Sequence, residues 1–313
     1  MALDALDTLS TDDQNWLLGE IKQTFNAVVK PDIPSVERFA TKLEGSELTW
    51  KSNTFSYAGT MKAFKGNAKV EALSSADFEI TSTLYQDGIY LDKRMLQADR
   101  TGYLKQVLSL TVPQLAQKTQ ATVASALYKL VDTCQATNTS HLDGQYIVDT
   151  DHSWPMGSYT TAQSNKGTTA FSADNLKTAF EAMRAFKDPA GDPLLVQEPD
   201  VLMVPNALYE DALDAIGVRT VSTGGENRLA GIVDVIRNPY MTETNDWYLM
   251  DCSDVIKPMV YYIPSFGESG LTNPRIEIND VKERNRYEIY VWLDFAVSWS
   301  GLWWKVWGST GGS

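Results

Sequence analysis

The sequence predicts an α+β fold framed by one long helix and one long strand. From Pro113 to about Gln135, apolar residues and threonines recur at three- and four-residue intervals. That spacing indicates a helix of roughly 23 residues, ~35 Å long, with Pro113 in its first turn. From Tyr287 to Trp299 every odd position is apolar, which is the period of a strand with one buried face. Between about residues 160 and 250, strand and helix patterns alternate and indicate an α/β unit.

An amphipathic helix is expected near the N-terminus. The stretch Thr11–Gln14 fits a capping box, and Pro31 closes the helix. The apolar residues that follow the capping box at helical spacing are Trp16, Leu17, Ile21, Phe25 and Val28. This helix packs either on its own domain or on a neighbouring copy. In the second case Trp16 and Ile21 are inter-subunit contact residues.

A long β-hairpin is expected between residues 48 and 92, where polar and apolar residues alternate weakly. Gly66-Asn67 fits the tip, with arms from about Trp50 to Phe64 and from Lys69 to Thr83. Each arm would extend roughly 50 Å at ~3.3 Å per residue. An isolated hairpin is marginally stable, so we expect it to lean on another subunit. The contact candidates near its tip are Met61, Lys62, Phe64, Lys65 and Lys69, although simple solubility of an exposed tip also accounts for the lysines.

The stretch Asp149-Thr150-Asp151-His152 is the most suggestive chemical cluster in the sequence. In an extended segment Asp149 and Asp151 face one side and His152 faces the other, which separates the would-be ligands. A catalytic zinc site needs about three protein ligands, and His141 is the one other histidine. We therefore expect a turn whose aspartates accept hydrogen bonds from local amides. The alternative is a hydrolase that uses His152.

The α/β unit has recognisable boundaries. Ser172 can cap a helix with an apolar face, and a buried strand is expected at Val201–Val204. A second helix starts near Pro205-Asn206 and stops at Gly217, and further strands are expected at 232–236 and 247–250. Between the second helix and the strand at 232–236, the loop Val218–Leu229 is flexible by composition.

The C-terminal third is rich in strand patterns and in tryptophan. Five of the nine tryptophans lie between Trp292 and Trp307, and we interpret them as part of a buried strand pair. A ligand-binding aromatic platform is the alternative. The last six residues, GSTGGS, are flexible by composition.

Composition excludes several classes of function. The net charge of −13 argues against sequence-independent nucleic-acid binding. It is compatible with a soluble protein whose acidic surface lies next to DNA and repels it. No run of 18 apolar residues exists and the N-terminus is acidic, which disfavours a membrane span or a signal peptide. Cys134 and Cys252 lack metal-ligand spacing and suit synthesis in a reducing cytosol. Ser222–Glu226 lacks the lysine of a phosphate loop, and no G-x-S-x-G motif occurs. We expect no enzyme activity, no cofactor and no metal.

The order of these elements is more specific than any one motif. It resembles the HK97 fold of tailed-phage major capsid proteins over nearly the whole chain. Local phrases are similar to those of Mu-like major head subunits, namely Asp143–Tyr146 with Asp149–His152, Asp92–Asp99, Trp247–Leu249 and Ile256–Pro258. Where that family has a proline after the Asp-His pair, this chain has Ser153.

The resemblance implies a division of the chain into named regions. These are an N-arm (1–47), an E-loop hairpin (48–92), a P domain with the spine helix (93–159), an A domain (160–250), and P-domain return strands with the C-terminus (251–313). It also implies pentamers and hexamers with the A-domain tip near the symmetry axes, where Gly224 and Gly225 would contact neighbouring copies.

The function that follows is a major capsid protein that self-assembles into an icosahedral shell around double-stranded DNA, without sequence-specific DNA binding. Scaffold, portal and decoration proteins are the expected partners beside further copies of the chain. The expected location is the virion, after assembly in the host cytoplasm. One rival is the shell of an encapsulin-like protein nanocompartment, and a second is the His152 hydrolase.

Overall fold

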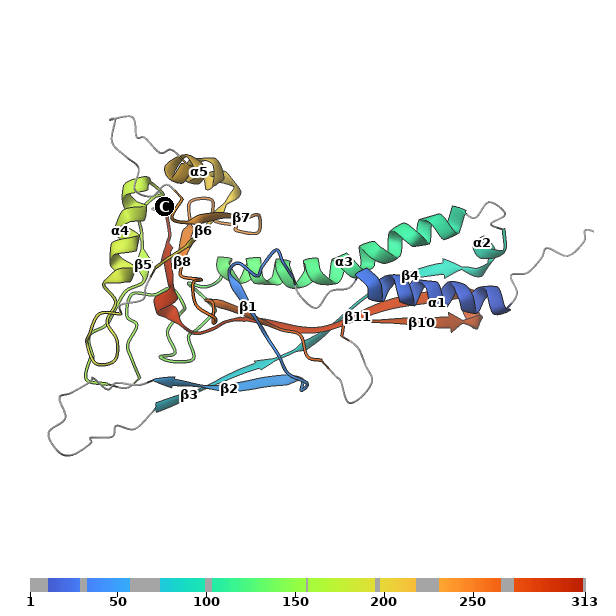
Figure 1. The fold of residues 1–313 in the computed structure, drawn as a ribbon, viewed down its shortest axis with the longest axis horizontal. Helices are drawn as coiled ribbons and strands as arrows, with labels where there is room; N and C mark the ends of the chain where they lie inside the picture. The colour runs from blue at the N-terminus through green and yellow to red at the C-terminus, as the bar shows by residue number, and fades with distance from the viewer. Residues whose placement is uncertain are drawn as a thin grey trace, which may run out of the picture.

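The computed structural model describes residues 11–28, 33–56, 74–98, 103–155, 157–194, 198–217, 231–265 and 273–311. Figure 1 shows a wide end and a long arm. The arm is built from α1 (Thr11–Val28), β4 (Thr83–Asp92), α2 (Lys93–Ala98), α3 (Tyr103–Asp132), β10 (Arg275–Val281) and β11 (Arg286–Trp299). The wide end holds α4 (Ala173–Arg184), β6 (Val201–Pro205), α5 (Tyr209–Gly217), β7 (Asp234–Asn238) and β8 (Trp247–Met250). Short 3₁₀ turns lie at Asn206–Leu208, Lys282–Arg284 and Trp303–Lys305.

The first sheet is organised around β11. Its order is β1 (Ala40–Leu43), β9 (Met259–Tyr262), β11, β10, and β4 also pairs with β11. β4 pairs with residues 286–295 of β11 and β9 pairs with residues 296–299, both antiparallel. Burial alternates along the first half of β11, and Ile289 is fully buried. The predicted strand with one buried face is confirmed.

The second sheet forms the core of the wide end in the order β5 (Lys166–Gly167), β12 (Val306–Ser309), β8, β6, β7. The expected cap of α4 is present, because Ser172 Oγ accepts a hydrogen bond from Asn175 N at 3.1 Å. The predicted strands in β6 and β8 and the helix end at Gly217 are also confirmed.

The prediction of a flexible C-terminus is wrong for Gly308 and Ser309. Both residues lie in β12 and are buried, and β12 pairs with β8. A Cβ at Gly308 would lie 2.7 Å from Val148 and 2.8 Å from the Tyr248 ring. Glycine is therefore required here by close packing against neighbouring side chains, whereas the composition indicated flexibility.

The long helix α3 extends further than predicted. It has 30 residues and starts at Tyr103, so Pro113 is inside the helix and not in its first turn. The φ angle of proline is compatible with a helix, so the helix can continue through Pro113. Proline also lacks the backbone N–H that would donate to the preceding turn, so the helix bends there. Figure 1 shows α3 bending along its length. The sequence prediction treated Pro113 as a start signal because proline is common there.

α1 packs on the arm of its own chain. Ile21 and Phe25 are buried in a cluster with Val112 and Leu115 of α3 and Ile289 of β11. Of the two packing modes left open by the sequence, packing within the chain is present.

No helix in the described ranges is long and apolar enough to cross a membrane.

The predicted hairpin is divided between two sheets. β2 (Thr49–Ser56) and β3 (Ser74–Thr81) form an antiparallel pair of their own. β4 follows after Ser82 alone and belongs to the first sheet. Ser82 holds this junction, because its backbone N and its Oγ donate to Leu48 O at 2.8 and 2.9 Å. The predicted Gly66-Asn67 tip lies outside the described residues.

Candidate functional surfaces

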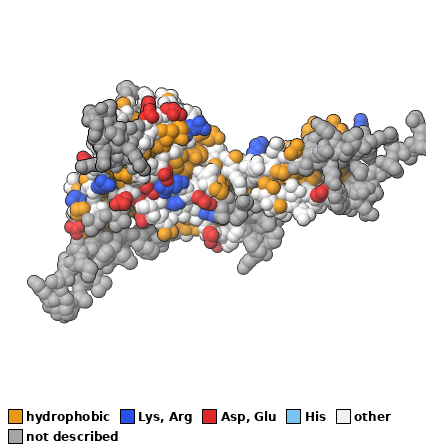
Figure 2. Space-filling model, turned by 45° about the horizontal axis from the view of Figure 1, so that its top comes forward, with side chains coloured by type: hydrophobic (Ala, Val, Ile, Leu, Met, Phe, Trp, Pro, Cys, Tyr) orange, Lys and Arg blue, Asp and Glu red, His pale blue; other side chains and the backbone are white. Residues whose placement is uncertain are grey.

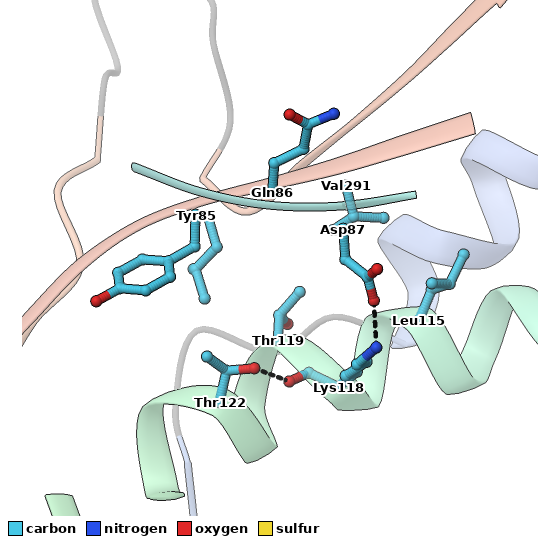
Figure 3. Close-up of a pocket in the computed structure, with 9 residues that line it drawn as sticks. Tyr85, Gln86, Asp87, Leu115, Lys118, Thr119, Thr122 and Val291 are labelled. Atoms are coloured by element: carbon cyan, nitrogen blue, oxygen red, sulfur yellow. Dashed lines mark hydrogen bonds and ion pairs between the residues drawn. The ribbon is translucent and has the colours of Figure 1, made fainter. Parts of the chain in front are cut away.

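A groove lies between α3, β4 and β11 in the arm. Its volume is ≈ 270 Å³. The lining residues are Tyr85, Gln86 and Asp87 of β4, Leu115, Lys118, Thr119 and Thr122 of α3, and Val291 and Leu293 of β11. The floor is apolar, since Leu115, Val291 and Leu293 are each no more than 7% exposed. Figure 3 shows the α3 side chains facing the strands across this space.

An ion pair closes one side of the groove. Lys118 Nζ donates to Asp87 Oδ2, and both side chains are largely exposed at 64% and 46%. This hydrogen bond lowers the pKa of Asp87, although partial burial opposes the effect. Exposed ion pairs contribute little to stability. The pair therefore mainly sets the charge pattern at the rim of the groove.

The base of the β2–β3 hairpin is attached to the body through aromatic contacts. Phe78 stacks on the His141 ring with centroids 4.6 Å apart, and Trp50 packs edge-on against Phe78 at 5.9 Å. Ile80 is 5% exposed. Burial lowers the pKa of His141, which keeps the ring neutral for stacking. The hairpin is thus held near its Trp50–Ile80 pair, at the end opposite to Ser56 and Ser74.

The sequence cluster around His152 is a structural connector in which the histidine itself is buried. His152 Nδ1 lies 2.7 Å from Asp143 Oδ2, and the two side chains are 0% and 2% exposed. The imidazole also stacks on Trp303 at 4.5 Å with an interplanar angle of 3°. Asp149 Oδ1 accepts from the backbone N of Thr150 at 2.8 Å, as expected for an aspartate-stabilised turn. Sequence reasoning missed Asp143 as the partner, because that contact depends on how the connector folds back.

This arrangement does not resemble a catalytic site. His152 Nε2 is buried and has no hydrogen-bond partner among the described residues, so the ring offers no nitrogen to a substrate in solvent. A general base must reach the proton that it removes. In the described part of the chain, no group of three or more His, Cys, Asp or Glu side chains could hold a metal ion. The geometry therefore supports the structural interpretation of the stretch over the hydrolase.

A second titratable cluster links the end of α3 to β8. Gln135 Nε2 donates to Tyr248 Oη at 2.9 Å, and Tyr248 Oη donates to Asp246 Oδ2 at 3.4 Å. Burial raises the pKa of Asp246 to about 6. Burial also raises the pKa of Cys134 to about 12, so the thiol stays protonated. These groups hold the segment that follows α3 against the second sheet.

The predicted contact residues fall into three groups. Ile21 is 4% exposed and lies in the arm core of its own chain. Trp16 lies in α1, but its side chain is outside the described residues. The others, which are Met61, Lys62, Phe64, Lys65, Lys69, Gly224 and Gly225, also lie outside the described residues. Their inter-subunit role stays a prediction.

Hydrophobic side chains also reach the surface of the wide end. Figure 2 shows them gathered above a band of charged side chains. Exposed members of this end include Leu213 of α5, Ile232 before β7 and Tyr240 after it, at 39%, 47% and 42% exposure. Apolar patches of this kind are typical of surfaces that meet other proteins.

Comparisons with known proteins give one matching protein family and several solved structures of similar fold. The profile of a family described as "Phage capsid protein" matches residues 79–304. No curated protein sequence matches the chain. Among solved structures, the capsid of Ralstonia phage GP4 aligns with a TM-score of 0.54 and 12% identity, covering 87% of this chain and 89% of that one. The bacteriophage JBD30 capsid gives 0.53 and 15%, covering 69% and 92%. A chain from Mycobacterium phage Patience gives 0.51 and 10%, covering 96% and 90%.

Proposed function

Since the chain belongs to the phage capsid protein family, we propose that its copies form the pentamers and hexamers of a closed icosahedral shell around double-stranded DNA. The predicted HK97-like fold is confirmed by the likeness to tailed-phage capsid chains, and the chain is a shell-forming subunit of the virion capsid. The kinship to Mu-like head subunits stays a prediction.

One observation carries the proposal. The family match runs from β3 to the turn after β11, so it includes the groove, the connector and most of both sheets. These elements make an elongated subunit with a wide end and a separate arm (Figure 1), which presents different surfaces to different neighbours. Contacts between unlike surfaces build rings when the rotation between copies closes. The net charge of −13 supports a shell that encloses DNA without binding it tightly.

The regions expected from the sequence extend this proposal. We assign residues 1–47 to an N-arm, 48–92 to an E-loop, 93–159 and 251–313 to a P domain, and 160–250 to an A domain. In this assignment residues 57–73 lie across an adjacent subunit, while the β2–β3 base stays fixed to its own chain by Phe78. Scaffold, portal and decoration proteins and assembly in the host cytoplasm are part of the same proposal. The family membership implies a structural role, and we propose no catalysis.

Electron microscopy of particles from cells that produce the chain, together with a nuclease-protection assay, tests the shell. Closed particles that protect double-stranded DNA in the presence of the packaging proteins are the expected result. Particles that enclose protein cargo instead would indicate a nanocompartment, and soluble monomers at all concentrations would contradict the proposal.

Deleting residues 60–68 should leave a folded subunit that forms no stable shell. Normal shells from the variant that lacks residues 60–68 would refute the E-loop assignment.

A further inference from the structure

The two histidines of the chain lie on either side of one carboxyl, where the β2–β3 hairpin meets the body of the subunit. His152 Nδ1 lies 2.7 Å from Asp143 Oδ2. His141 comes two positions before Asp143 and stacks on Phe78 of β3, with ring centroids 4.6 Å apart. Histidine is the side chain whose ordinary pKa lies between pH 5 and 8. A change in the charge of His141 would therefore act directly on the contact between hairpin and body.

The body side of this contact is fixed. A Cβ at Gly301 would lie 2.0 Å from His141 Nδ1, so the imidazole lies directly against the segment that follows β11. Ser140 Oγ donates to Gly301 O at 2.8 Å and accepts from Leu142 N at 3.2 Å, which ties the neighbours of His141 to the same segment. Phe78, on the other side of the ring, belongs to a two-stranded sheet, and such a sheet has little stability of its own. The hairpin is therefore the part that separates when the contact weakens.

The surroundings of His141 disfavour a charged ring. Burial lowers the pKa of His141 from its ordinary value of 6.5, and the negative charge of Asp143 opposes this effect in part. Nδ1 is buried, so water cannot hydrate that side of an imidazolium. The Asp143 carboxylate is engaged by other groups, since its Oδ2 lies 2.7 Å from His152 Nδ1 and its Oδ1 accepts from Gln145 N at 3.2 Å. The contact with Phe78 is thus made by a neutral ring.

The other elements at this contact carry few ionisable groups. Asp77 and Glu79 flank Phe78 in β3, and side chains alternate along a strand, so both point to the opposite face. Glu79 Oε2 also accepts from Lys51 Nζ at 2.9 Å across the strand pair. Residues 300–302, which follow β11, are Ser-Gly-Leu and do not ionise. Among the described residues that make the contact, the histidine is therefore the one whose ordinary pKa is close to neutral.

We propose that His141 is a pH-sensitive latch, which holds the β2–β3 hairpin on the body at neutral pH and lets it separate in mild acid. At this ring the attached state binds fewer protons than the separated state, because only separation lets water reach the charged form. The contribution of the latch is fully present above about pH 6.5 and is lost as the pH falls through the lowered pKa of the ring. The latch is a property of the single subunit and does not depend on assembly.

The first test follows the full-length, unassembled wild type from about pH 7.5 to about pH 5. With two histidines in the chain, labelled histidine gives two ring signals in an NMR spectrum, and contact with the Phe78 ring identifies that of His141. This signal should titrate below pH 6.5. Hydrogen exchange in 49–56 and 74–81, corrected for its intrinsic pH dependence, should lose protection over the same range. The expected loss is about tenfold for each unit between the measured ring pKa and 6.5.

Two outcomes of this titration would overturn the proposal. One is a His141 ring that titrates at or above pH 6.5. The other is a hairpin that keeps its protection after the ring has become charged. Both are read from the wild type, so they do not depend on whether a variant folds.

The second test removes the charge and keeps an aromatic ring. In His141→Phe the ring can still stack on Phe78 and binds no proton, so the hairpin should stay protected at about pH 5. The matched variant Phe78→Ala removes the stack, so its hairpin should have low protection at both ends of the pH range. Strands β6 and β8 are entirely buried and serve as the internal reference, with unchanged protection throughout. Equal acid-dependent losses in wild type and His141→Phe would refute the latch, as would a parallel loss in β6 and β8, which indicates global unfolding.

Discussion

Replacing Asp246 with asparagine should stabilise the subunit at neutral pH and leave it unchanged in acid. Burial raises the pKa of this carboxyl from 3.8 to about 6, so the folded chain prefers the protonated form. Between these two values the folded state binds more protons than the unfolded state, and stability falls as pH rises. Above pH 6 the folded protein carries the full penalty of an ionised buried group. Asparagine has the same shape and does not ionise.

The size of the effect follows from the pKa difference. A change from 3.8 to about 6 corresponds to at most about 3 kcal/mol in the free energy of unfolding. Asp246 as a whole residue is 9% exposed, so solvent still screens the carboxylate in part and we expect a gain on the order of 1–2 kcal/mol at pH 8. Gln135 and Tyr248 can still donate to the asparagine oxygen, so no buried donor loses its partner.

Urea unfolding of unassembled subunits at pH 4 and pH 8 measures the difference. The two proteins should have similar unfolding free energies at pH 4, and the variant should be more stable at pH 8. Asp174→Asn is the control, because that side chain is 91% exposed. A variant that is less stable than the wild type at pH 8, or a difference that is constant with pH, would contradict the assignment of a penalised buried carboxylate.

Two further substitutions test the packing of the C-terminal strand and of the connector. Gly308→Ala should cost about 1–3 kcal/mol in unfolding free energy, because a methyl group there meets a buried tyrosine ring at 2.8 Å. Gly217→Ala, with no atom of the described residues within 4 Å of the new methyl group, should be neutral or stabilising, and equal effects would argue against the close packing. Asp143→Ala should cost about 1–3 kcal/mol, because it leaves a His152 ring nitrogen buried without its partner. Asp149→Ala removes one local hydrogen bond and should cost less, and the reverse order would show that the buried pair is not the main anchor.

Elements with a strong local period could be predicted from the sequence. The alternation in β11 and the cap of α4 at Ser172 follow from hydrogen-bond geometry and burial within a few residues of chain. Where one residue type is compatible with two local structures, the sequence pattern could not distinguish between them. Pro113 can start a helix or bend one, and Gly308 can be flexible or closely packed, and in both cases neighbouring elements decided the outcome.

The candidate surfaces depend even more on the tertiary structure. The sequence by itself determined the order of elements, because that order follows from periodicity and composition along the chain. Its resemblance to shell proteins rests on that order together with short motifs such as Asp149–His152. Only the folded chain brings Asp143 to His152, opens a groove between α3 and β4, and places Lys305 beside Asp254. Those contacts join residues 9, 31 and 51 positions apart, and no local pattern records which distant side chains meet.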